Sequence, residues 1–158
     1  MVTLLCLRPV PSVAAAANVD IFIDLPLRPL TQPPSAQLSA YSCLATVECD
    51  GEGSCAVRTR QRYQLALSPG TPASTMRLGL PAEALDRRTA PTDIALRDEQ
   101  GNALPIASHD ADVHAIWEVA MTPGQPRTLE LSYRHAASTA PLIIWSWEVA
   151  ALSAWGTV

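Results

Sequence analysis

The sequence predicts an all-β protein. Fourteen prolines are spread along the 158 residues and lie mostly between apolar runs, so few uninterrupted segments are long enough for an α-helix. Within those segments apolar and polar residues alternate with a period of two, which is the pattern of a strand with one buried face. A chain of this length can bury a hydrophobic core of its own, so we expect one domain.

The charge pattern argues against two classes of partner. The net charge is −4, only 16% of the residues are charged, and every cationic side chain is an arginine. A mildly acidic chain without a clustered basic run lacks the electrostatic footprint of a nucleic-acid or anionic-membrane protein. We therefore expect no nucleic-acid partner.

Residues 1–17 resemble a secretory signal. A short apolar run, Val2 to Leu7, is followed by small residues that end in an A-x-A pattern at Ala17, although Arg8 and two prolines interrupt the segment. The alternative is a disordered N-terminal arm or a wrongly assigned start. On the signal interpretation, residues 18–158 form a single secreted or cell-envelope associated domain.

Residues 43–67 predict a β-hairpin. If Asp50 to Ser54 form the turn, two sets of alternating residues fall on the same face of the hairpin. The first set is Tyr41, Cys43, Ala45, Val47 and Cys49, and the second is Cys55, Val57, Thr59, Gln61, Tyr63, Leu65 and Leu67.

The hairpin places three cysteines in defined positions. Cys49 lies opposite Cys55, and directly opposed residues of antiparallel strands are close to disulfide distance, so we expect a Cys49–Cys55 disulfide. A zinc site is less favoured, because the cysteines are separated by five residues each and no histidine lies nearby. Reduced thiols in a reducing compartment are the third interpretation. Cys43, opposite Gln61, is the odd cysteine: an inert buried thiol or a site for pairing with another chain.

Three arginines share the other face of the same hairpin. Arg58, Arg60 and Arg62 follow one another at period two, and such a row can grip carboxylates or phosphates bidentately. The simpler interpretation is a solvated strand face with Glu48 nearby.

The rest of the chain continues the strand pattern. Residues 74–81 form an apolar strand closed by a proline, and residues 81–88 are the only segment with helical propensity. A hairpin with Gln100 to Asn102 at its tip follows, and then two alternating strands at 113–121 and 127–134, joined by a turn. Together these segments predict an immunoglobulin-like antiparallel β-sandwich of about 7 to 9 strands with at most one short helix.

Two motifs resemble a known family. The stretch "VRTRQRYQLALSPGTPASTMRLGLP" and the later "MTPGQPRTLELSYR" are similar to bacterial extracytoplasmic β-sandwich modules of the vault/inter-alpha-trypsin (VIT) type. In those modules an apolar strand ends in Leu-Pro, and a Pro-Gly turn leads into a strand that ends in tyrosine. The resemblance covers about residues 55 to 134 and implies a non-catalytic surface or scaffold module.

The C-terminal segment "PLIIWSWEVAALSAWGTV" is the most apolar part of the chain. It is short for a membrane span and contains Glu148, so we expect a buried strand and no transmembrane segment. Trp145 and Trp147 lie on one face; they fill a core or, if exposed, form a platform for sugar rings. The sheet is expected to end in an exposed edge, which another protein or a second copy covers.

A second cluster consists of His109, Asp112 and His114, with Asp110 and Glu118 nearby. These side chains could bind a divalent metal ion, although a polar turn that enters a strand explains them equally simply. The sequence contains none of the common nucleophile, phosphate-loop or zinc-protease motifs. We expect no enzymatic activity and no cofactor.

The sequence therefore predicts a non-catalytic extracytoplasmic module with a structural or protein-binding role at the cell envelope. The alternatives are a carbohydrate-binding module that uses its tryptophans and a divalent-metal-binding protein.

Overall fold

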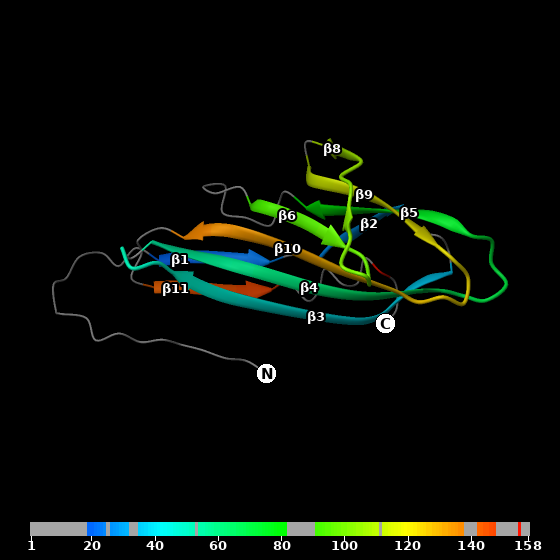
Figure 1. Cartoon of the computed structure of the whole chain (residues 1–158), viewed down its shortest axis with the longest axis horizontal. Coiled ribbons are helices and arrows are strands. Elements are labelled where there is room, and N and C mark those ends of the chain that lie inside the picture. Colours follow the sequence, from blue (N-terminus) through cyan, green and yellow to red (C-terminus); the bar gives the residue numbers. More distant parts are fainter. Residues whose placement is uncertain are drawn as a thin grey trace.

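The computed structural model describes residues 19–24, 26–31, 35–52, 54–81, 91–110, 112–137, 142–147 and 155, with only the backbone of 19–24, 137 and 142–147 (Figure 1). The chain order is β1 (Val19–Asp24), β2 (Arg28–Thr31), β3 (Ala36–Cys49), β4 (Cys55–Leu67), β5 (Ser74–Pro81), β6 (Thr92–Arg97), β7 (Ala103–Leu104), β8 (Ser108–Asp110), β9 (Val113–Met121), β10 (Arg127–Ala137) and β11 (Leu142–Trp147). These described segments contain no α-helix. The predicted leader and the predicted helical segment lie outside them, apart from Pro81, which ends β5.

Nine of the strands form two antiparallel sheets. One sheet has the order β3-β4-β10-β6-β7 and the other the order β2-β5-β9-β8. The turn after Met121 carries the chain from β9 in one sheet to β10 in the other, and Gly124 in this turn has φ +70°, a conformation that suits glycine. The predicted antiparallel β-sandwich is therefore confirmed, whereas its immunoglobulin-like character stays a prediction.

The core lies between these two sheets and follows the period-two pattern of the sequence. It includes Tyr63, Leu65 and Leu67 of β4, Leu129, Leu131 and Tyr133 of β10, Met76, Leu78 and Leu80 of β5, and Ala115, Trp117, Val119 and Met121 of β9. Alternate residues of these strands point into one layer, as the buried faces of two packed sheets must.

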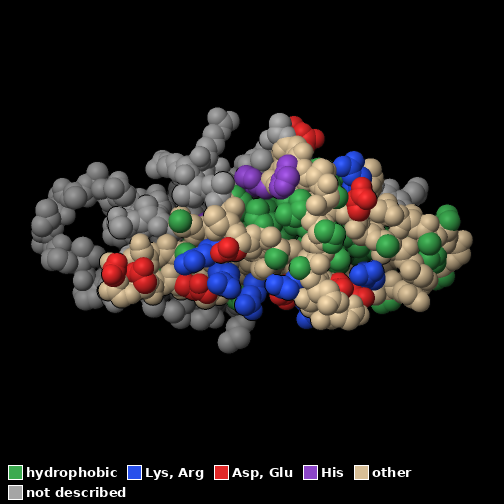
Figure 2. Space-filling model, turned by 45° about the horizontal axis from the view of Figure 1, so that its top comes forward, with side chains coloured by type: hydrophobic (Ala, Val, Ile, Leu, Met, Phe, Trp, Pro, Cys, Tyr) green, Lys and Arg blue, Asp and Glu red, His purple; other side chains and the backbone are tan. Residues whose placement is uncertain are grey.

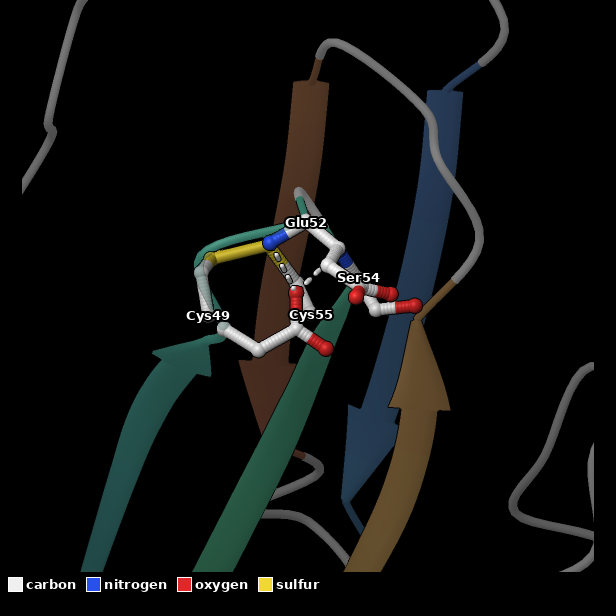
Figure 3. Close-up of a disulfide and its surroundings, with 5 residues drawn as sticks. Cys49, Glu52, Ser54 and Cys55 are labelled. Atoms are coloured by element: carbon white, nitrogen blue, oxygen red, sulfur yellow. Dashed lines mark hydrogen bonds between the residues drawn. A yellow bond between two sulfur atoms is a disulfide. The ribbon is translucent and has the colours of Figure 1, made fainter.

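A parallel pair of strands was not predicted. β1 pairs with β11, with Val19 opposite Leu142 and Asp24 opposite Trp147. In Figure 1 the long strands β3, β4 and β10 run past the left ends of β5 and β9, and the β1–β11 pair lies behind them there. Figure 3 shows the β1–β11 pair behind β3, β4 and β10 near the disulfide. One half of the long sheet is thus backed by the four-stranded sheet, and the other half faces the parallel pair.

A group of buried polar side chains lies along the middle of β4 and β10. The Tyr63 hydroxyl accepts a hydrogen bond from the Leu27 backbone N–H (2.6 Å) and donates one to Gln61 Oε1, while Gln61 Nε2 donates to the Tyr133 hydroxyl (3.0 Å). The Trp155 indole N–H donates to the Leu27 carbonyl (2.8 Å). Burial raises the pKa of Tyr63 well above its usual value, with a further contribution from Tyr41.

The described residues contain no helix that is long and apolar enough to cross a membrane.

Candidate interaction surface at the free edge of β3

β3 is one of the two edge strands of the five-stranded sheet. It pairs with β4 along its whole length, from Ala36 opposite Leu67 to Cys49 opposite Cys55, with one irregularity between Leu38 and Ala40. No strand in the described part of the chain pairs with its other side. At 14 residues β3 is long for an edge strand, since strands usually contain 3 to about 10 residues.

The register shows which backbone groups of β3 point away from β4. The Asp50 N–H donates to the Ser54 carbonyl at 2.9 Å, and the Cα atoms of Cys49 and Cys55 are 4.0 Å apart. Such a short Cα distance indicates a non-hydrogen-bonded pair, and the two kinds of pair alternate along an antiparallel ladder. Ala45 and Val47 therefore also occupy non-hydrogen-bonded positions and direct their N–H and C=O groups away from β4.

The same end of β3 exposes large apolar side chains. Leu44 is 56% exposed and Val47 is 50% exposed, and the third large exposed hydrophobic of the described residues is Ile106 at 41%. Proteins usually protect an edge strand with charges, prolines or a very short length. Between Leu44 and Val47 the strand has neither a charge nor a proline. This end of β3 is therefore open to pairing with another strand.

A closed turn fixes the end of β3. The predicted Cys49–Cys55 disulfide is present and joins opposed residues of β3 and β4. The Asp50 carboxylate accepts hydrogen bonds from the backbone N–H groups of Glu52 (3.0 Å) and Ser54 (2.8 Å), as Figure 3 shows at the tip. The disulfide and these bonds hold the exposed end in an extended conformation before any partner arrives.

Cys43 lies opposite Gln61, as the sequence predicted, and is half-buried. It takes no part in the disulfide. Its predicted roles, an inert thiol or a link to another chain, stay predictions.

The predicted arginine row lies on the outward face of the sheet. Arg60 and Arg62 are exposed, and the Arg58 guanidinium makes an ion pair of 3.1 Å with Glu48. The sequence reasoning missed Arg134, which lies directly opposite Arg58 on β10 and is also exposed. The alternation of β10 contained only part of the signal, because a buried Tyr133 directs Arg134 outward, whereas its place beside Arg58 follows from the pairing of β10 with β4. Figure 2 shows Arg side chains gathered on this part of the surface.

The metal candidates do not converge in the described structure. His109 Nδ1 lies 2.7 Å from the backbone carbonyl oxygen of His114, and Asp112 is exposed in the turn between β8 and β9. The described residues contain no group of three or more His, Cys, Asp or Glu side chains that could hold a metal ion. Partial burial lowers the pKa of His114. Metal binding stays a prediction without structural support.

The predicted tryptophan platform lies on β11. Trp145 and Trp147 are two residues apart in this strand, opposite Phe22 and Asp24 of β1. Their side chains lie outside the described part of the structure, and the choice between core and platform stays open.

Comparisons with known proteins show the fold alone. No known protein family matches the chain, and no curated protein has a detectably similar sequence, so the resemblance to VIT modules stays a prediction. The fold is similar to the crystal structure of a protein from Legionella pneumophila, described as a candidate nutrient binding protein, with a TM-score of 0.55 and 9% sequence identity. The likeness covers 75% of this chain and 44% of the Legionella protein. The chain thus spans less than half the length of that protein.

Proposed function

We propose that the protein is a non-catalytic β-sandwich module of the cell envelope, which binds an extended segment of another protein as an added strand on β3. The observation that carries the proposal is the open end of β3, where N–H and C=O groups that point away from β4 lie beside exposed Leu44 and Val47. In strand addition, main-chain hydrogen bonds supply affinity and side-chain contacts supply selectivity. Both components are available at this edge.

Two observations support an extracytoplasmic location. A disulfide such as Cys49–Cys55 persists in oxidising compartments and is rare in the cytosol. Residues 1–17 also have the composition of a secretory signal. A binding role agrees with the description of the Legionella protein, whose fold is similar.

Site-specific photo-crosslinking in the host tests the proposal. A photoreactive amino acid is placed at Leu44, at Val47 or, as the matched control, at Ile106, the third exposed apolar residue, which lies outside β3. We expect one partner protein to be linked from positions 44 and 47 and not from 106. Equal labelling from all three positions, or none from 44 and 47, would contradict the proposal.

A proline substitution separates strand addition from general stickiness. Val47→Pro removes an N–H that points away from β4, so the ladder between β3 and β4 remains while the edge loses a donor. Val47→Thr keeps the donor and a β-branched side chain. We expect crosslinking from position 44 to be lost in Val47→Pro and kept in Val47→Thr; retention in both would exclude pairing at this edge.

The intact mass of the protein purified from its host, without reduction, tests the location. We expect the mass of residues 18–158 less two hydrogens for the disulfide. A full-length chain whose thiols all react with an alkylating reagent would place the protein in a reducing compartment and contradict the envelope assignment.

A further inference from the structure

We propose that the segment added to β3 is acidic and carries carboxylates at alternate positions, which the arginines on the outward face of the sheet bind. This inference rests on the proposed function and names the chemistry of the partner at the same edge.

The outward face beside β3 is positive although the chain is negative. Across β3, β4 and β10 the outward positions hold Arg58, Arg60, Arg62 and Arg134 against two carboxylates, Glu48 and Glu130. Four positive groups and two negative groups give this face a charge of +2, whereas the whole chain has a net charge of −4. A local field opposite in sign to the net charge favours an acidic partner at this face.

The arginines next to the edge are available for a partner. Within the described residues no carboxylate lies within ion-pair distance of Arg60 or Arg62, and Arg58 has one partner, Glu48. The side chains of both members of that pair are more than 40% exposed, and exposed pairs contribute at most about 1 kcal/mol. A partner carboxylate can therefore replace Glu48 at little cost.

The spacing of the row fits a second extended chain. Alternate residues of a strand lie about 6.6–6.8 Å apart, and an added strand has the same repeat. The added strand would lie about 4.8 Å outside β3, and β4 lies the same distance inside it. Only Ser42, Leu44 and Thr46 of β3 separate the two on the outward face. Guanidinium groups on long side chains can reach across these short residues and bind carboxylates bidentately.

Two other occupants fit less well. A second copy of the chain would offer Glu48 as the only acidic residue between Leu44 and Cys49 of its own β3, so it cannot supply carboxylates at alternate positions. Single-stranded nucleic acid binds to aromatic side chains on which its bases stack. The described outward positions of β3, β4 and β10 carry no aromatic residue.

Selection from a displayed library of random 12-residue peptides on the oxidised full-length protein tests the inference. We expect the recovered peptides to carry Asp or Glu at every second position. We expect their affinity to fall about tenfold in R60Q/R62Q, in Val47→Pro, and when their own Glu residues are changed to Gln. The control R28Q/R77Q, which removes two arginines from the other sheet, should bind as the unchanged protein does.

The outcomes separate the two proposals. Neutral peptides that lose binding only in Val47→Pro would overturn the acidic partner and leave the edge proposal intact. Acidic peptides that bind Val47→Pro as tightly as the unchanged protein would overturn strand addition itself. Failure to enrich any peptide over the uncoated surface would overturn both. Tighter binding of a 12-nucleotide oligothymidine than of the peptides, lost in R60Q/R62Q, would overturn the acidic peptide in favour of a nucleic acid.

Discussion

The two ends of the β3–β4 hairpin are built from the same pair of strands but are stabilised differently. At one end Leu38 and Leu65 lie opposite each other and are buried in the sandwich core. At the other end Leu44 and Val47 are exposed, and the Cys49–Cys55 disulfide closes the tip. Strand pairing gives both ends their shape, whereas the layer behind the strands decides how much each side chain contributes to stability. A long sheet can therefore combine a rigid support with an exposed binding edge.

The largest expected effect contrasts two leucines of this hairpin. Leu65→Ala removes a fully buried side chain, and we expect it to lower the free energy of unfolding by about 2–5 kcal/mol, because a cavity remains. Leu44→Ala changes a side chain that is 56% exposed and should cost no more than about 0.5 kcal/mol. Urea unfolding measures both; similar losses would contradict the contrast between the two ends.

A smaller loss of unfolding free energy is expected from a change at Tyr63, near the middle of β4. Tyr63→Phe leaves the buried Leu27 N–H without its acceptor, which should cost about 1–3 kcal/mol. The raised pKa of Tyr63 adds a pH dependence. The folded protein keeps this proton above pH ~10, where unfolded tyrosines release theirs. The free energy of unfolding should therefore fall as the pH rises above about 10.

Unfolding measured from pH 8 to 11 checks this second effect. The decline should be shallower in Tyr63→Phe, since the variant lacks the group whose pKa is raised. An equally steep decline in both proteins would show that Tyr63 does not cause the pH dependence.

The smallest effect concerns the exposed end. The disulfide closes a loop with a sequence separation of only 6, so a Cys49→Ser/Cys55→Ser variant should lose no more than about 2 kcal/mol. We expect most of the change to be local. Hydrogen exchange should accelerate at Glu48 and Ala56, which pair beside the tip, and stay unchanged at Leu65 and Leu131. Uniform acceleration along β4 would show that the two ends unfold together.

The sequence predicted the hairpin well because its information is local. Period-two alternation sets the faces, and the turn residues set the register, so Cys49 opposite Cys55 and Cys43 opposite Gln61 could both be predicted. The irregularity after Leu38 was missed. The strand there gains one residue relative to its partner, so even-numbered Leu38 and odd-numbered Tyr41 both contact the core.

Contacts between distant segments could not be predicted in the same way. Alternation identified Val19–Leu25 as a strand but says nothing about its partner, so the pairing of β1 with β11 was missed. Arg134 was missed as a neighbour of the arginine row for the same reason, because only the pairing of β10 with β4 brings it to Arg58. The sequence thus predicted the part of the candidate site that lies on the β3–β4 hairpin and missed the part that β10 adds.

The parallel pair has a consequence for the order of folding. Val19 lies opposite Leu142, and the difference of these numbers is 123 residues. At a synthesis rate of about 5–20 residues per second, β1 waits roughly 6 to 25 s for its partner to be made. Closing so long a stretch of chain also costs more entropy than closing a hairpin. The first of these strands to be synthesised is therefore among the last to be paired, and during that interval its hydrogen-bonding groups are open to chaperones.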